Sequence, residues 1–234
     1  MSIDAVLDHV AIAVPDADRA RRRWSDELGG GLAILGDTPT FSSRQLRFGN
    51  GAKLELLAPP PSAPTDNFVV AFLGRFGAAV HHITLKVPDL LAAVSTLEAE
   101  GLSPVDVFTG HPAWHEAFLR PSQVGGIVVQ VAWSGYSDED WATEVGHHPE
   151  EPRAEAAALL GPTLVHDDLR AAATLWRRLG ARVEETERAL RCTWPDSPLD
   201  VVVQRGDHQG AVGLRMAGTP SLPAEEGVGP AVSA

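Results

Sequence analysis

The sequence predicts an α+β fold in which tandem βαβββ modules form a curled mixed sheet around a cleft, with a third, degenerate βαβββ module after them. The main observation is an internal repeat. The segment VLDHVAIAVPDADRARRRWSDELGG, which begins at Val6, recurs as AVHHITLKVPDLLAAVSTLEAEGL, which begins at Ala79. The later segments GAKLELLA and GIVVQVAW also match each other. Repeats of this kind indicate structural units of one design that bury their apolar faces together.

Each module is expected to begin with a strand and a helix. In both copies an apolar strand runs into Val-Pro-Asp, at residues 14–16 and 87–89, and a helical segment then ends at Gly29 or Gly101. An aspartate before a helix and a glycine after it are typical of helix ends. Further strand-like runs, such as FSSRQLRF and WHEAFLRP, complete each unit. The expected boundaries are residues 6–60 and 79–133, paired within a domain at residues 1–133.

The rest of the chain is expected to contain a linker, a third module and a flexible tail. Acidic residues, Pro and Gly are frequent in residues 134–155, which favours a linker. The segment GPTLVHDDLRAAATLWRRLGARV again has the pattern of strand, helix and glycine, so residues 156–216 are expected to form the third module. AVGLRM, from Ala211, resembles the first strand of a fourth unit. Residues 217–234, rich in Pro, Gly and Ala, are expected to be loose.

Composition excludes several classes of function. The 234 residues have a formal net charge of -12, which argues against binding nucleic acid through its phosphates. The single cysteine, Cys192, allows no intrachain disulfide and suits a reducing compartment. The N-terminal residues do not read as a secretory signal, and no apolar run reaches the roughly 18–20 residues that a membrane helix needs. We therefore expect a cytoplasmic protein without nucleic-acid or membrane partners.

The repeat also matches two polar residues in each of the first two modules. Alternation along the strands places His9 on the face with the small residues of LDHVAIAV, and His82 on the polar face of VHHITLKV. Glu55 and Gln130 stand at matching positions between apolar neighbours, where a polar group is costly unless it is paired, solvated or bound to a metal. A pseudo-twofold would bring together two imidazoles, a carboxylate and an amide oxygen. Such a set suits a divalent ion such as Zn, Co, Ni or Mn.

Other polar residues have weaker support as site residues. His81 shares the apolar face of its strand, so we expect a packed or hydrogen-bonded imidazole there. His111, His115 and Glu116 lie in TGHPAWHEAF, which would either line the cleft or form an ordinary loop and edge strand.

The third module departs from the pattern of the first two. Alignment of its closing Gly180 with the glycine of the first module places Leu160 at the position of His9, and Asp200 falls near that of Glu55. Because the imidazole is lost, we expect this module to bind no metal. A single curled half-sheet leaves a face and a strand edge uncovered, so we expect the module to pack against the first two or to pair with its copy in a homodimer.

Residues 6–133 resemble the vicinal oxygen chelate superfamily, and in particular its glyoxalase I and methylmalonyl-CoA epimerase branch. The resemblance rests on LDHVAIAV, KLELLAP, FLGRFGAAVHHITLKVPDL and FLRPSQVGGIVVQV. It implies that a metal ion is held by His9, Glu55, His82 and Gln130. It also implies isomerase or lyase chemistry in which the metal stabilises an enediolate of a small carbonyl or acyl-thioester substrate.

The resemblance further implies a carboxylate that moves the proton. Glu55 is the natural base, and Glu116 is expected as a second one. A two-base epimerase needs a carboxylate on each face of the reacting carbon, so the residues argue against strict methylmalonyl-CoA epimerase activity. Two alternatives stay open. One is a protein that sequesters an antibiotic or aromatic metabolite without chemistry. The other is an extradiol-type iron dioxygenase, which the amide of Gln130 disfavours.

Overall fold

The computed structural model describes residues 1–218 and confirms the α+β class. The first repeat forms β1 (Val6–Ala13), α1 (Ala17–Leu28), β2 (Gly31–Asp37), β3 (Ser42–Arg47) and β4 (Lys53–Ala58). Helix α2 (Phe68–Phe76) precedes the second repeat, which forms β5 (Ala79–Lys86), α3 (Leu90–Ala99), β6 (Val105–His111), β7 (Trp114–Leu119), the 3-10 turn η1 (Pro121–Gln123) and β8 (Val128–Ser134). The remaining elements are α4 (Asp138–Glu144), β9 (Ala158–His166), α5 (Leu169–Arg178), β10 (Arg182–Glu185), β11 (Ala189–Thr193), β12 (Asp200–Arg205) and β13 (Gly210–Ala217).

The strands of the first two repeats form a mixed sheet in the order β2-β3-β4-β1-β5-β8-β7-β6. Each half has the same strand order when it is followed outward from β1 or from β5. The first strand of the module comes first, and then its last, third and second strands. The outer strands of each half pair antiparallel, whereas β5 and β8 pair in parallel. The repeat in the sequence is therefore a repeat of topology, as predicted.

The Val-Pro-Asp motif marks the helix starts. Asp16 caps α1 by accepting a hydrogen bond from the backbone N–H of Arg19, and Asp89 caps α3 through Ala92 in the same way. Helix α1 ends at Gly29, whose φ of 77° is left-handed. The motif thus places the end of the first strand and the start of the helix at the same point in both modules.

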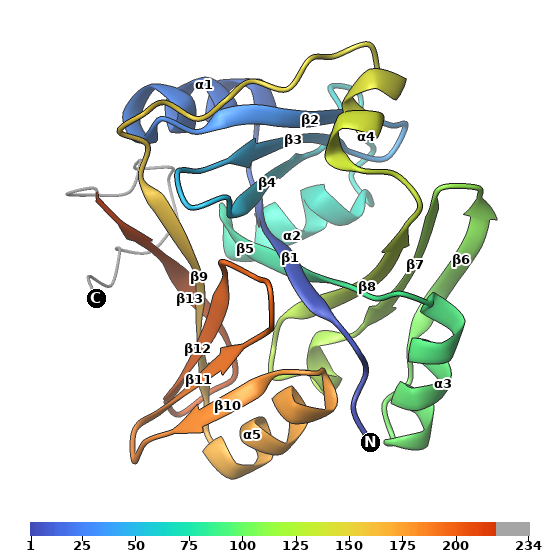
Figure 1. Ribbon diagram of the computed structural model, residues 1–234, viewed down its shortest axis with the longest axis vertical. Coiled ribbons are helices and arrows are strands. Elements are labelled where there is room, and N and C mark those ends of the chain that lie inside the picture. Colours follow the sequence, from blue (N-terminus) through green and yellow to red (C-terminus); the bar gives the residue numbers. More distant parts are fainter. Residues whose placement is uncertain (219–234) are drawn as a thin grey trace. The chain divides into compact units, whose positions relative to one another are not determined.

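The third module repeats this design in a second sheet, with the strand order β10-β11-β12-β9-β13. Asp168 caps α5, which lies against β10, β11 and β12 (Figure 1). The apolar face of α5 is buried, and its Trp176 meets Trp194 edge to face at 6.0 Å between ring centroids. Strand β13 lies next to β9 at the edge of this sheet and contains the segment predicted as the first strand of a fourth unit.

Residues 134–155, expected as a linker, contain helix α4. Ser137 starts this helix with a capping box. In its first turn, Asp138 lies 3.1 Å from Nζ of Lys53 and 3.1 Å from Nη2 of Arg47. These contacts attach the segment to the edges of β3 and β4. A connection with its own helix and partly buried ion pairs is more ordered than its composition indicates.

By its contacts the chain divides into two compact units that cut across the modules. One consists of Met1–His9, His82–Gly135 and Gly161–Val212, and the other of Val10–His81, Tyr136–Leu160 and, among the described residues, 213–218.

The first unit has a core of strand residues from β5 and β8, and in the second unit Trp24 packs edge to face on Phe48. Within residues 1–218, the helices are too short or too polar to cross a membrane. The tail expected at residues 217–234 lies, beyond Gly218, outside the described residues.

Candidate metal centre

The repeat places an imidazole at the same point of each of the first two modules. His9 stands seven residues before the N-cap Asp16, and His82 stands seven residues before the N-cap Asp89. Both side chains are buried, with exposed fractions of 5% and 7%. Their ring centroids lie 5.9 Å apart in an edge-to-face arrangement, and a nitrogen of one ring lies within 4.8 Å of a nitrogen of the other. The two predicted nitrogen ligands are therefore neighbours.

The ring of His9 is oriented by the carboxylate next to it in the sequence. Nδ1 of His9 lies 2.7 Å from Oδ2 of Asp8, and Oδ1 of Asp8 lies 3.3 Å from Nζ of Lys86. A carboxylate accepts the hydrogen of Nδ1, which leaves Nε2 as the nitrogen that can face a ligand. Histidine metal ligands are commonly oriented by such a partner on the other nitrogen.

A chain of hydrogen bonds joins His9 to the last strand of the second module. The parallel pairing of β5 with β8 places Thr84 opposite Gln130. The Thr84 hydroxyl lies 2.9 Å from Nε2 of His9 and donates to Oε1 of Gln130 at 2.6 Å. Nε2 of Gln130 donates to Oε2 of Glu116 at 2.7 Å, and the same oxygen accepts from Nε1 of Trp114 at 2.9 Å. Three of the predicted site residues, His9, Gln130 and Glu116, are thus connected through Thr84.

Glu55 lies in β4, in the other compact unit, and is half-buried. Its carboxylate is the oxygen donor that the repeat predicts for the first module. Its cross-strand partner Gln45 is buried, and Oε1 of Gln45 has no hydrogen-bond partner within residues 1–218. An unpaired buried amide oxygen is uncommon in folded proteins and marks a place where a ligand, an ion or water can complete the structure.

These side chains fit a divalent metal ion. Two imidazoles, a carboxylate and an amide oxygen are nitrogen and oxygen donors of the kind that zinc, cobalt, nickel and manganese accept. The donors also have the oriented outer partners that metal ligands need, since Asp8 holds His9 and Glu116 holds Gln130. A divalent ion held by such donors would supply Lewis-acid chemistry.

Sequence reasoning selected the candidate ligands but missed residues around them. Asp8 and Thr84 contact candidate ligands directly, and neither was chosen as a site residue. For Thr84 a signal existed, because it is a hydroxyl on the same strand face as His82. His81, predicted to be a packed imidazole, is confirmed as one: its ring lies 4.7 Å from that of Phe72.

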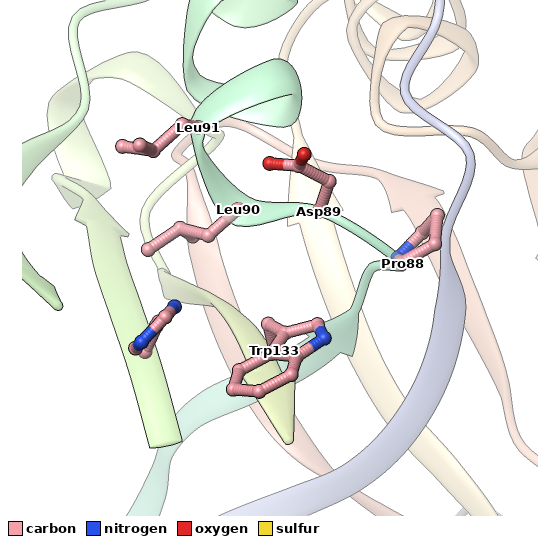
Figure 2. Close-up of a pocket in the computed structure, with 6 residues that line it drawn as sticks. Pro88, Asp89, Leu90, Leu91 and Trp133 are labelled. Carbon is pink, nitrogen blue, oxygen red and sulfur yellow. The ribbon is translucent and has the colours of Figure 1, made fainter. Parts of the chain in front are cut away.

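A pocket of about 280 Å³ opens on the opposite face of this part of the sheet. Figure 2 shows it between the first turn of α3 and Trp133. The pairing of β7 with β8 places His115, which lines this pocket, opposite Trp133, whereas Glu116 stands one residue further along. Alternate residues of a strand point to opposite faces, so the pocket is separate from the hydrogen-bonded chain that ends at Glu116.

The third module has the backbone frame of this site with different residues in it. Gly161 stands seven residues before the N-cap Asp168, so it occupies the position of the imidazoles. The prediction that Leu160 occupies this position was wrong by one residue. The reason is that the closing glycine lies 13 residues after the N-cap in the first module, at Asp16 and Gly29, but 12 residues after it in the third, at Asp168 and Gly180.

The strand register gives the other equivalent positions. Thr163 pairs with Val202 between β9 and β12, as Thr84 pairs with Gln130 between β5 and β8. Val202 therefore holds the place of the amide ligand. Asp200, predicted at this place, lies at the start of β12 and binds Nε of Arg191 at 2.7 Å. At both equivalent positions, Gly161 and Val202, the third module has a residue without a side-chain atom that can coordinate a metal.

Comparisons with known proteins agree with this architecture. Residues 8–118 match the model of the Glyoxalase/Bleomycin resistance protein/Dioxygenase superfamily. Mitochondrial methylmalonyl-CoA epimerase of Mus musculus is 31% identical over 130 residues, which are 53% of this chain and 71% of the mouse protein. The ethylmalonyl-CoA/methylmalonyl-CoA epimerase of Cereibacter sphaeroides is 30% identical over 130 residues, which are 53% of this chain and 95% of that protein.

Solved structures extend the likeness to the third module. The crystal structure of methylmalonyl-CoA epimerase from Mycobacterium tuberculosis is 26% identical, with a TM-score of 0.52, over 58% of this chain and 92% of that chain. A hypothetical protein from Staphylococcus aureus matches over 98% of this chain and 100% of its own, with a TM-score of 0.69 and 11% identity, which concerns the fold alone. The repeat, the topology and these relatives show that the chain belongs to the glyoxalase/bleomycin resistance protein/dioxygenase superfamily, also called the vicinal oxygen chelate superfamily.

Proposed function

We propose that this chain is a metal-dependent isomerase of the epimerase type, which moves a proton on the carbon next to the carbonyl group of an acyl thioester. The proposed ligands of the metal are His9, Glu55, His82 and Gln130. One observation carries the proposal: His9 and Gln130, from the first strand of one module and the last strand of the next, share the buried hydroxyl of Thr84. A fold that needed these residues only for packing would have no use for buried polar groups in such an arrangement.

The chain's own residues would hold the metal ion and transfer the proton of the substrate. A bound divalent ion would act as a Lewis acid that polarises the carbonyl oxygen of the substrate. Glu55 is the proposed general base, because its carboxylate can accept the proton from the neighbouring carbon. Inversion also needs a proton returned to the opposite face of that carbon, and a water molecule is the proposed donor, because Glu116 already accepts hydrogen bonds from Trp114 and Gln130.

The substrate class follows from the acidity that the reaction needs and from the relatives. A carbon that stands between a thioester and a carboxylate loses its proton more readily than one beside a single carbonyl. The mouse and Cereibacter proteins are named as epimerases of methylmalonyl-CoA, and the latter also of ethylmalonyl-CoA. We therefore propose a 2-alkylmalonyl thioester as the substrate of this chain, and isomerase chemistry in preference to lyase chemistry.

The test is proton exchange at the substrate carbon. Purified protein loaded with Co²⁺ is mixed with one epimer of methylmalonyl-CoA in D₂O, and deuterium at the second carbon is followed by NMR while the epimer ratio is followed by chiral analysis. The proposal expects incorporation of deuterium together with inversion. Binding of the thioester without exchange would contradict it and favour a sequestering protein.

The role of Glu55 is tested with Glu55→Gln. An amide oxygen can still coordinate a metal but cannot take the proton, so exchange should fall by about 10²–10⁴-fold, the contribution of general base catalysis. The metal content should remain close to that of the unchanged protein. A metal-loaded Glu55→Gln protein with full exchange activity would transfer the role of base to another group.

We also propose that the protein is a homodimer. The third module already packs on residues of its own compact unit: the hydroxyl of Ser197 donates to the carbonyl of Leu7 at 2.6 Å, and Nε of Arg178 lies 3.3 Å from Glu100. The other proposed arrangement, pairing with a second copy, adds to these contacts. Light scattering of the full-length protein during size exclusion should give twice the mass of the chain, and a monomeric mass at all concentrations would exclude the dimer.

A further inference from the structure

We infer that Glu116 is a positioning residue that acts through Gln130: together with Thr84 it holds the amide of Gln130 with its oxygen toward His9 and its nitrogen away. This inference rests on the proposed function, because it concerns how one proposed ligand is presented to the ion. It gives Glu116 a different role from that of a second base.

The two ends of the Gln130 amide differ in their chemistry. Only its oxygen can serve as a metal ligand, because an amide nitrogen has no available lone pair, and the two ends have nearly the same shape. The carboxylate of Glu116 can accept hydrogen bonds but not donate them. At 2.7 Å from Oε2 of Glu116, the group on Gln130 must therefore be the nitrogen.

The hydroxyl of Thr84 fixes the other end of the amide. It has one hydrogen, which it donates to Oε1 of Gln130 at 2.6 Å. Its oxygen also lies 2.9 Å from Nε2 of His9. Thr84 is fully buried, so water cannot reach this position and replace the hydroxyl. A reversed amide would place two acceptors against each other at Glu116, and it would also lose the hydrogen bond from Thr84.

Glu116 is itself held in place. Nε1 of Trp114 donates to the same Oε2 at 2.9 Å, so one carboxylate oxygen accepts two hydrogen bonds from strands β7 and β8. Phe118 is the direct cross-strand partner of Gln130, which places Glu116 at the diagonal position on the same face of the sheet. A carboxylate that is held by two donors is well placed to orient its neighbour.

The experiment measures Co²⁺ affinity by titration calorimetry, with the visible absorption of bound Co²⁺ as a second readout, and it needs no substrate. Glu116→Gln keeps the volume but offers a donor and an acceptor, so it permits both orientations of Gln130. We expect the dissociation constant for Co²⁺ to rise by about 10–100-fold, the usual effect of losing an outer partner of a ligand, and the absorption bands to shift. Glu98→Gln, the same change of charge at an exposed position of α3, should leave both readouts unchanged.

A double-mutant cycle with Gln130 shows whether Glu116 acts through this proposed ligand. In a Gln130→Ala background, Glu116→Gln should have no further effect on Co²⁺ affinity, because the residue that it positions is gone. An equal loss in both backgrounds would overturn the inference.

Thr84 supplies an independent arm in case Glu116→Gln does not fold. Thr84→Val removes the hydroxyl and should weaken Co²⁺ binding by a similar factor, whereas Thr84→Ser keeps the hydroxyl and should restore it. Unchanged affinity in both Glu116→Gln and Thr84→Val would overturn the inference while the proposed function stands. If the unchanged protein binds no divalent ion, the proposed function fails and this inference fails with it.

Discussion

The second and third modules have the same frame and differ in a few side chains at its centre. In both, a first strand pairs in parallel with the last strand of the module, and an aspartate caps the helix that follows. Thr84 and Thr163 occupy the same place in this frame, and both are buried. The hydroxyl of Thr84 lies between two polar partners, whereas Oγ1 of Thr163 has no hydrogen-bond partner among residues 1–218.

The difference shows that the fold and the polar site are separable. The third module has Gly161 and Val202 at the places of the imidazole and the amide, and it retains its strands, its helix and its buried tryptophan. The frame is stabilised by its apolar faces and helix caps, which do not depend on the site. We therefore propose that the polar residues of the first two modules serve a ligand and not the needs of folding.

The largest expected effect on stability is that of placing a side chain at Gly161, the position in the third module that matches the imidazoles. Gly161 has a φ of +124°, and a Cβ there would lie 2.0 Å from the backbone oxygen of Asp200. Gly161→Ala should therefore lower the free energy of unfolding by about 4 kcal/mol, which combines roughly 1–3 kcal/mol of backbone strain with a similar cost of overpacking. Urea unfolding followed by circular dichroism measures it.

Gly51→Ala is the matched control, because Gly51 also has a left-handed φ, of +81°, but open space around it. It should show the strain without the overpacking. Equal effects at the two positions would mean that the third module can accept a side chain at the imidazole position, and the comparison of the two modules would lose its steric basis.

The next prediction compares the stability changes on removing the hydroxyl of Thr84 and that of Thr163. Thr84→Val should destabilise the protein by about 1–3 kcal/mol, because it leaves buried polar atoms of His9 and Gln130 without the hydroxyl. Thr163→Val removes a hydroxyl that is already unpaired and should stabilise the protein by about 1 kcal/mol. Urea midpoints that move in the same direction for both variants would contradict the proposed distinction.

The smallest expected effect is the contribution to stability of the Arg44 ion pairs, which lie away from the candidate site in the first module. A hydrogen bond from Arg44 holds the pKa of Asp18 and that of Asp37 below their ordinary value of 3.8. The stabilisation is complete above pH 3.8 and is lost as the pH falls through the lowered values. Because both carboxylates are more than half exposed, the effect should stay below about 1 kcal/mol.

Arg44→Met should therefore lower stability near neutral pH, and its difference from the unchanged protein should disappear in acid. Arg22→Met, at an exposed position of α1, controls for the loss of a positive charge. Metal affinity at neutral pH should be the same in all three proteins. A change of affinity in Arg44→Met would show that the edge and the site are coupled.

Much of the fold could be predicted because the sequence repeats. Two copies of strand, Val-Pro-Asp, helix and glycine determine the module, and local capping at Asp16 and Asp89 made the elements recognisable. The third module was recognised by the same pattern, although alignment on a glycine misplaced its central position by one residue. Helix α4 was missed, because its stability depends on ion pairs of Asp138 with residues far away in the sequence.

The candidate site was predictable only in part, for a related reason. His9, His82 and Gln130 could be chosen from strand parity and the repeat, both of which can be read from the sequence alone. The place of Thr84 between two of them depends on the register of β5 with β8, and the hydrogen bond from Gln130 to Glu116 depends on that of β7 with β8. A sequence pattern without register cannot show which polar neighbours meet.

The most direct test of the account is the stoichiometry of divalent metal binding, measured by titration of the metal-free full-length protein with Co²⁺ in a calorimeter. The account predicts one ion per chain, held by residues of the first two modules, and no binding by the His9→Ala/His82→Ala variant. It also predicts that Asp200→Asn, in the third module, still binds one ion. The account would be contradicted if the double variant retained the ion, or if the unchanged protein bound none.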